Sequence, residues 1–177
     1  MSASTDPAQA ERADALQRLT NYLDAAELAY ELAGQGGVVV TLAGEHKLRT
    51  SALFVVGTHA LTVNAFVARR PEQNVAAVHE WLLERNRRMY AVAFCIDHLG
   101  DIYLTGRLPL SVVDDPEELD RLLGCILEYS DGSFNTLLEM GFADAIRREW
   151  QWRIARGEST ANLAAFAHLM DRSSAGS

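Results

Sequence analysis

Residues 71–108 carry the clearest alternation of apolar and polar positions in the chain. Apolar residues first recur every three or four positions, which predicts an amphipathic helix with inward positions Val75, Val78, Leu82 and Met89. The period then becomes two, which predicts a half-buried strand with inward positions Tyr90, Val92, Phe94 and Ile96. A turn over residues 97–101 and a second alternating run over residues 102–108 complete a predicted β-hairpin.

The chain before this helix predicts a first helix and three strands. Asp6 can cap free amides and Pro7 suits the first helical position, so the helix is expected to start there. Alternating apolar runs separated by short turns predict adjacent antiparallel strands over residues 38–43, 48–56 and 60–68. The pattern around Tyr30 fits either a last helical turn or a short edge strand.

The C-terminal part predicts helices only. Asp115 and Pro116 mark a helix start, and the inward positions that follow are Leu119, Leu122, Leu123, Ile126 and Leu127. Gly141 is the expected break before a last helix over residues 142–156. The elements together predict an α+β fold, in which an antiparallel sheet of about five strands packs with helices in the order α-βββ-α-ββ-α-α.

Length and composition favour one domain, because 177 residues with 49% hydrophobic content supply a single well-buried core. We expect a disordered N-terminus over residues 1–6, an α+β domain over residues 7–156 and a tail over residues 157–177. The tail contains the apolar stripe Leu163, Phe166, Leu169 and Met170. This stripe is either a short helix that docks on a neighbouring subunit or partner, or a frayed end.

Charge and cysteine usage narrow the classes of function. The formal net charge of −8 repels polyphosphates and disfavours a nucleic-acid partner. No apolar run approaches the roughly 20 residues that span a bilayer, and the N-terminus lacks a signal-peptide pattern. Cys95 and Cys125 lie among apolar neighbours, as free thiols do in a reducing compartment. We therefore expect a cytoplasmic protein that binds no membrane.

Reactive side chains do not form a constellation that suggests catalysis. His59, His79, His98 and His168 are scattered, without the spacing that places metal ligands on one helix face. No G-x-S-x-G elbow follows a predicted strand, and both thiols are expected to be buried. We therefore expect no enzymatic activity, no catalytic residues, no cofactor and no metal.

The basic run Arg85, Arg87 and Arg88 is the first candidate contact surface. Arginines at a helix C-terminus complement the helix dipole and solvate the surface, and the functional alternative is contact with an acidic partner. Asn86 lies within this run but falls on the inward stripe, four residues after Leu82, where its amide needs hydrogen-bond partners. We expect Asn86 to tie the helix end to the following strand.

The second candidate surface combines Arg147, Trp150 and Trp152 with Phe166 of the tail stripe. Helix positions two apart diverge by about 200°, so the two tryptophans cannot both face one core and one should be partly exposed. Exposed Trp and Arg anchor many protein interfaces. Packing of this helix on its own domain is the alternative.

The element order resembles that of the YbjN-like domain family, whose fold is similar to that of type III secretion chaperones. The resemblance runs from Leu16 to Leu138 and rests on the segments VVGTHALTVNAFV, NVAAVHEWLLERNRRM, YAVAFCIDHLGDIYL and LDRLLGCILE. It implies a sensory-transduction or stress-related regulator without established catalytic residues. No functional residue can be transferred from it.

We therefore expect a non-enzymatic protein-binding module, chaperone-like or regulatory, that forms a homodimer and holds a protein partner. A small-ligand sensor or cryptic enzyme is the alternative. Its pocket would lie between the sheet and the helix that follows Asp115.

Overall fold

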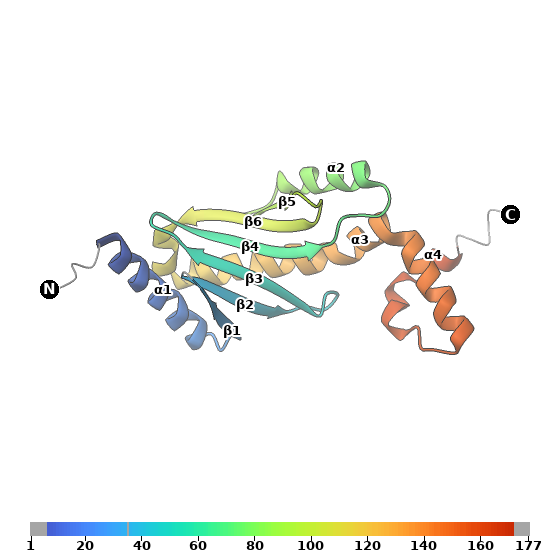
Figure 1. Cartoon of the computed structure of the whole chain (residues 1–177), viewed down its shortest axis with the longest axis horizontal. Coiled ribbons are helices and arrows are strands. Elements are labelled where there is room, and N and C mark those ends of the chain that lie inside the picture. The colour runs from blue at the N-terminus through green and yellow to red at the C-terminus, as the bar shows by residue number, and fades with distance from the viewer. Residues whose placement is uncertain (1–6, 35, 172–177) are drawn as a thin grey trace.

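The computed structural model describes residues 7–34 and 36–171. Its centre is a six-stranded antiparallel sheet in the order β1-β2-β3-β4-β6-β5, shown in Figure 1. The strands are β1 (Tyr30–Ala33), β2 (Gly37–Ala43), β3 (Arg49–Val56), β4 (Ala60–Ala68), β5 (Ala93–Ile96) and β6 (Ile102–Pro109). The predicted α+β fold is confirmed. The expected count of about five strands was one short, because the ambiguous segment at Tyr30 forms edge strand β1.

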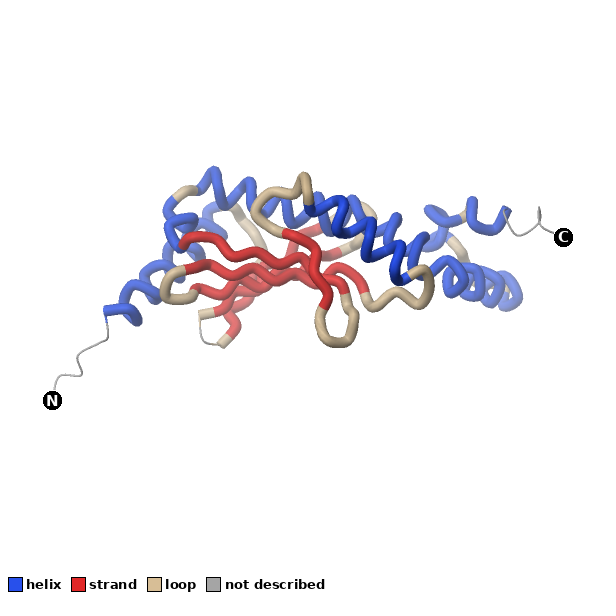
Figure 2. Tube along the Cα trace, turned by 90° about the horizontal axis from the view of Figure 1, so that it is seen from above, coloured by secondary structure: helices blue, strands red, loops and turns tan. Residues whose placement is uncertain are grey.

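The helices gather along one face of the sheet, and none of the described residues forms a helix on the opposite face, the helix-free face (Figure 2). They are α1 (Pro7–Ala25), α2 (Val75–Asn86), α3 (Pro116–Arg156) and α4 (His168–Asp171), with short 3₁₀ helices η1 (Leu110–Asp114) and η2 (Ala161–Phe166). Pro7 opens α1 as expected, whereas the cap proposed for Asp6 and the disorder proposed for residues 1–6 lie outside the described residues.

Strand alternation decides which side chains meet the helices. The register places Val40, Ala52, Ala65, Leu104 and Phe94 in one row across five strands, and all five are buried. Full burial of an aliphatic or aromatic side chain contributes about 1.5–3 kcal/mol. On β4 the alternation predicted from sequence is confirmed, with Leu61, Val63, Ala65 and Val67 all facing the core.

The α2–β5 connection differs from the predicted helix and strand. Met89 lies beyond the end of α2, and β5 begins at Ala93, so Tyr90 is not part of the strand. Ala91 has a φ of 62°, a conformation that interrupts both periodic structures. The backbone N–H of Tyr90 instead donates to the Tyr129 hydroxyl on α3 at 3.1 Å.

Helix α3 is 41 residues long and bends where the sequence predicted a break. Phe142 leaves the helical region with φ −141° and ψ 15°. The carbonyl of Gly141 then accepts the backbone N–H groups of Glu72 and Gln73, at 3.0 and 3.1 Å. The loop between β4 and α2 is therefore inserted into the hydrogen-bond ladder of α3, which is a recognised cause of kinks.

The tail after the kink folds back on α3. Ala143 and Ile146 of α3 form a small buried cluster with Phe166 and Leu169 of the tail. This cluster is separate from the main core beneath the sheet. It forms the part of the molecule that extends beyond the sheet, next to the label α4 in Figure 1.

A buried polar joint connects α3 to the β2–β3 loop. One Asp131 carboxylate oxygen accepts the backbone N–H groups of His46 and Lys47, at 2.9 and 2.8 Å. Beside it, the Thr50 and Ser130 hydroxyls are hydrogen-bonded at 3.0 Å. Partial burial raises the pKa of Asp131, but the backbone donors outweigh it, so this pKa lies below its ordinary value.

Candidate partner-binding surfaces

Asn86 sits at the end of α2 and performs the structural role predicted for it. Its side-chain amide donates to the Phe94 carbonyl at 3.1 Å, and its side-chain oxygen accepts the Phe94 N–H at 2.8 Å. The backbone N–H and C=O of Phe94 point away from β6. The direction follows from strand alternation, because Asp97, three positions on, donates its N–H to the Asp101 carbonyl on the inner side. One side chain therefore fixes the helix end to the outer edge of the sheet.

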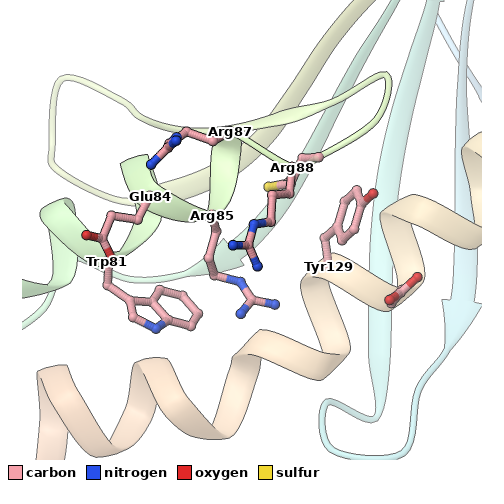
Figure 3. Close-up of a pocket in the computed structure, with 8 residues that line it drawn as sticks. Trp81, Glu84, Arg85, Arg87, Arg88 and Tyr129 are labelled. Carbon is pink, nitrogen blue, oxygen red and sulfur yellow. The ribbon is translucent and has the colours of Figure 1, made fainter.

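A groove lies between the C-terminal end of α2 and the adjacent surface of α3 (Figure 3). Its volume is about 680 Å³. The side chains that form it are Trp81, Glu84, Arg85, Arg87, Arg88, Met89, Glu128 and Tyr129. All three arginines of the first candidate surface therefore border one hollow.

Arg85 is held over the Trp81 ring, with its guanidinium carbon 4.7 Å from the ring centroid. The other neighbour of the indole is the Phe94 ring, at a centroid distance of 6.4 Å. Sequence reasoning missed Trp81 as a site residue, although its i, i+4 spacing to Arg85 is a usable signal for such a pair. Tyr129 could not be found in this way, because it comes from α3.

The second candidate surface is only partly exposed. Trp152 has 45% of its surface exposed and carries the Arg156 guanidinium 4.7 Å from its ring centroid. Trp150 is half-buried. The expectation that the two tryptophans differ in exposure therefore agrees with the structure.

Two other residues of the second candidate surface serve the chain itself. Arg147 donates to the Leu169 carbonyl at 3.2 Å and pairs with Asp144 at 2.7 Å, so it fastens the tail to α3. Phe166 is only 5% exposed, because it packs in the small cluster with Ile146. Phe166 is therefore not an exposed contact residue. The apolar stripe of the tail packs on α3 of the same chain.

The helix-free face of the sheet is a further candidate surface. The strand alternation predicted from sequence implies such a face, but none of its residues was predicted as a contact residue. Val39, Leu53, Asn64 and Thr105 share one row across β2, β3, β4 and β6 on this face. In the next row, the Phe66 ring makes an edge-on contact with the Tyr103 ring at 5.4 Å. Apolar and aromatic groups therefore alternate with small polar ones on this face.

The space assigned to the alternative function is occupied by core side chains. Leu119, Leu122 and Ile126 of α3 are at most 1% exposed against the sheet. This leaves no room for a small ligand at these positions between the sheet and the helix after Asp115. Asp115 itself caps α3, accepting the Glu117 and Glu118 N–H groups at 3.1 and 3.2 Å, as predicted.

The Cys95 thiol and the acidic and histidine side chains are the groups that bear on reactive and metal-binding sites. Burial, and to a smaller extent the Asp97 carboxylate, raises the pKa of the Cys95 thiol, so this thiol remains protonated at neutral pH. Residues 7–34 and 36–171 contain no group of three His, Cys, Asp or Glu placed to hold a metal ion. Among the same residues, no helix has the length and apolar character required to cross a membrane.

Comparison with solved structures identifies the same arrangement of elements elsewhere. A chain in the crystal structure of the ExsC–ExsE complex superposes with a TM-score of 0.53 at 14% sequence identity. The match covers 71% of the present chain and 95% of that chain. The similarity concerns the fold, which is type III secretion chaperone-like.

Sequence comparison gives much closer relatives. The chain is 48% identical to the Mycobacterium tuberculosis protein Rv0487 over 156 residues, which cover 85% of each chain. It is 52% identical to ML2442 of Mycobacterium leprae over 134 residues, which cover 76% of this chain and 72% of that one. Both relatives are described as uncharacterized.

A protein-family comparison matches residues 15–139 to YbjN, described as "Putative bacterial sensory transduction regulator". The matched region contains the whole sheet and ends just before the kink in α3. Because this region is well over half of the 177 residues, the chain belongs to the YbjN family.

Proposed function

We propose that the chain is a non-enzymatic protein-binding module, chaperone-like or regulatory, that works as a cytoplasmic homodimer. The observation that carries this proposal is the helix-free face of the sheet, where Leu53 and Phe66 are partly exposed and the Lys47 ammonium lies 5.2 Å from the centre of the Phe66 ring. Membership of a family described as regulatory supports it. So does the likeness of the fold to a chain crystallised in a complex, that of ExsC with ExsE.

The chemistry of this face suits a protein segment. Flat apolar surfaces bordered by polar groups are typical of protein interfaces, and aromatic side chains dominate their binding energy. The Phe66 and Tyr103 rings supply the aromatic component, and Asn64 and Thr105 supply hydrogen-bonding groups within the same rows or the next. An extended segment lying across β3 and β4 would contact both kinds of group.

Leu53→Asp tests this proposal by placing a charge at the centre of the face. Ser51→Asp is the matched control, because Ser51 lies on the same strand and the same face but is already polar and exposed. Tagged forms of both variants and of the parent chain are used to capture proteins from native lysate, and captured proteins are quantified by mass spectrometry. We expect the parent chain and Ser51→Asp to enrich the same partners and Leu53→Asp to lose them at least tenfold.

Oligomeric state is measured on the same three proteins by light scattering after gel filtration, which tests the proposed homodimer. Equal melting temperatures establish that the variants are folded. Failure of the parent chain to enrich any protein above a tag-only control would contradict the protein-binding role. A monomeric parent chain at micromolar concentration would contradict the dimer.

A further inference from the structure

We propose that the α2–α3 groove binds an acidic segment of a protein partner, with Arg85 and Arg88 as the groups that recognise its carboxylates. The groove is bordered by Trp81, Arg85, Arg88 and Tyr129. This inference rests on the proposed protein-binding function and assigns a chemistry to one side of the molecule. The helices lie on one face of the sheet (Figure 2), so the groove between α2 and α3 is on the opposite side from the helix-free face.

Among the described residues, some arginines are paired with carboxylates, and those of the groove are not. Arg18, Arg121, Arg147, Arg148 and Arg153 each pair with a carboxylate. Within residues 7–34 and 36–171, no ion pair is formed by Arg85, Arg87 or Arg88. Other described arginines, such as Arg69 and Arg107, also form no ion pair, but the groove gathers three such arginines around one hollow.

The groove also contains Glu84 and Glu128, which reduce its positive charge without pairing directly with its arginines. Both carboxylates border the hollow, and neither forms an ion pair with Arg85 or Arg88. Arg88 lies in the turn that follows α2, and its backbone N–H donates to the Arg85 carbonyl at 3.0 Å, so the chain holds two like charges near each other, where they repel. A carboxylate bound between them would relieve this repulsion.

The guanidinium groups of Arg85 and Arg88 both extend over the space between α2 and α3, whereas Arg87 points away from them (Figure 3). The Trp81 ring holds the Arg85 guanidinium by its face, at 4.7 Å, and leaves the N–H groups at its edge free for hydrogen bonds. Such a pre-oriented guanidinium loses less conformational entropy on binding a carboxylate in bidentate fashion.

An acidic protein segment fits this site better than a polyphosphate does. The overall charge of −8 disfavours ligands of high charge density, and a protein segment can space its carboxylates between apolar residues whereas a polyphosphate cannot. The groove also offers apolar contact through Trp81 and Met89. We therefore expect a segment in which acidic residues alternate with apolar ones.

The test uses a fluorescein-labelled peptide of twelve residues in which Glu and Leu alternate, and a second peptide with Gln in place of Glu. Binding is measured by fluorescence anisotropy. We expect the parent chain to bind the acidic peptide at least tenfold more tightly than the neutral one. Loss of one charge-assisted hydrogen bond corresponds to about tenfold in affinity, so Arg85→Gln with Arg88→Gln should abolish the preference.

Arg156→Gln is the matched control, because Arg156 also lies 4.7 Å from a tryptophan ring but far from the groove in the chain. It should retain the full preference. The proposal is overturned if the parent chain shows no preference for the acidic peptide, or if the double variant keeps it. It is also overturned if inorganic phosphate at millimolar concentration displaces the peptide completely, since the groove would then be a small-anion site.

The same proteins separate this proposal from the proposed function. If the double variant captures the partners of the parent chain from lysate at unchanged levels, the groove proposal fails while the protein-binding role stands. If the parent chain captures no partner but prefers the acidic peptide through Arg85 and Arg88, the groove chemistry stands and the wider function fails.

Discussion

Replacing Asn86 with Ala tests how the end of α2 is joined to the sheet. The substitution removes two hydrogen bonds, at 2.8 and 3.1 Å, and leaves the N–H and the carbonyl of Phe94 without these partners. A half-buried group that loses its partner costs about 1–3 kcal/mol. Water reaches part of this edge, so we expect a total loss of about 2–3 kcal/mol in the free energy of unfolding.

The measurement is urea denaturation followed by circular dichroism, with an unchanged slope and a lower midpoint. Asn86→Asp is the control that separates the two bonds, because an aspartate still accepts the Phe94 N–H but cannot donate to its carbonyl. Near pH 7, the free energy of unfolding of Asn86→Asp should lie between those of the parent chain and Asn86→Ala. Hydrogen exchange at the Phe94 amide should accelerate in Asn86→Ala. A loss below about 0.5 kcal/mol with unchanged exchange would refute the reasoning.

Three further substitutions test other joints of the fold. Gly141→Ala should destabilise by about 1–3 kcal/mol in urea denaturation, because its new methyl group would lie 2.9 Å from a Pro71 carbon; a neutral effect would contradict the close approach. Phe166→Ala should weaken the packing of the tail on α3 by about 2–4 kcal/mol. Limited proteolysis should then cleave the chain faster after the kink, while cleavage within the sheet stays unchanged. Asp131 has a lowered pKa, so its stabilising contribution is present above its unfolded value near pH 4 and is lost as the pH falls through the lower folded value. Asp131→Asn should therefore flatten the acid branch of the stability–pH curve, and an unchanged branch would contradict the assignment.

The spacing of apolar residues predicted most of the fold, because burial determines which positions are apolar. On β4 every second residue faces the core, so the period of two was visible without knowing the neighbouring strands. On β1 it was not, because only four residues are involved and Leu32, whose register partner Val38 faces the core, is 70% exposed at the sheet edge. A short edge strand does not carry enough of a pattern to be distinguished from a helical turn.

Features that depend on distant contacts were less accessible. Gly141 indicated where α3 is weak, but the bend is stabilised by the N–H groups of Glu72 and Gln73, nearly seventy residues earlier. The apolar residues of the tail could be recognised in the sequence. The residues on which they pack, Ala143 and Ile146 of α3, could not. The arginines around Asn86 were visible as charges, and only the structure combined them with Trp81 and Tyr129 in one groove.

The two edges of the sheet have different consequences for assembly. Contact of β1 in one copy with β5 in the next would repeat from copy to copy and produce a ring or a filament. Asn86 occupies the outward backbone groups of Phe94 that such contact requires. On β1, the outward groups belong to Tyr30 and Leu32, because Thr41 pairs with Ala29 on the inner side. Two β1 edges can pair with each other only once, so growth of the sheet between copies ends at a closed pair.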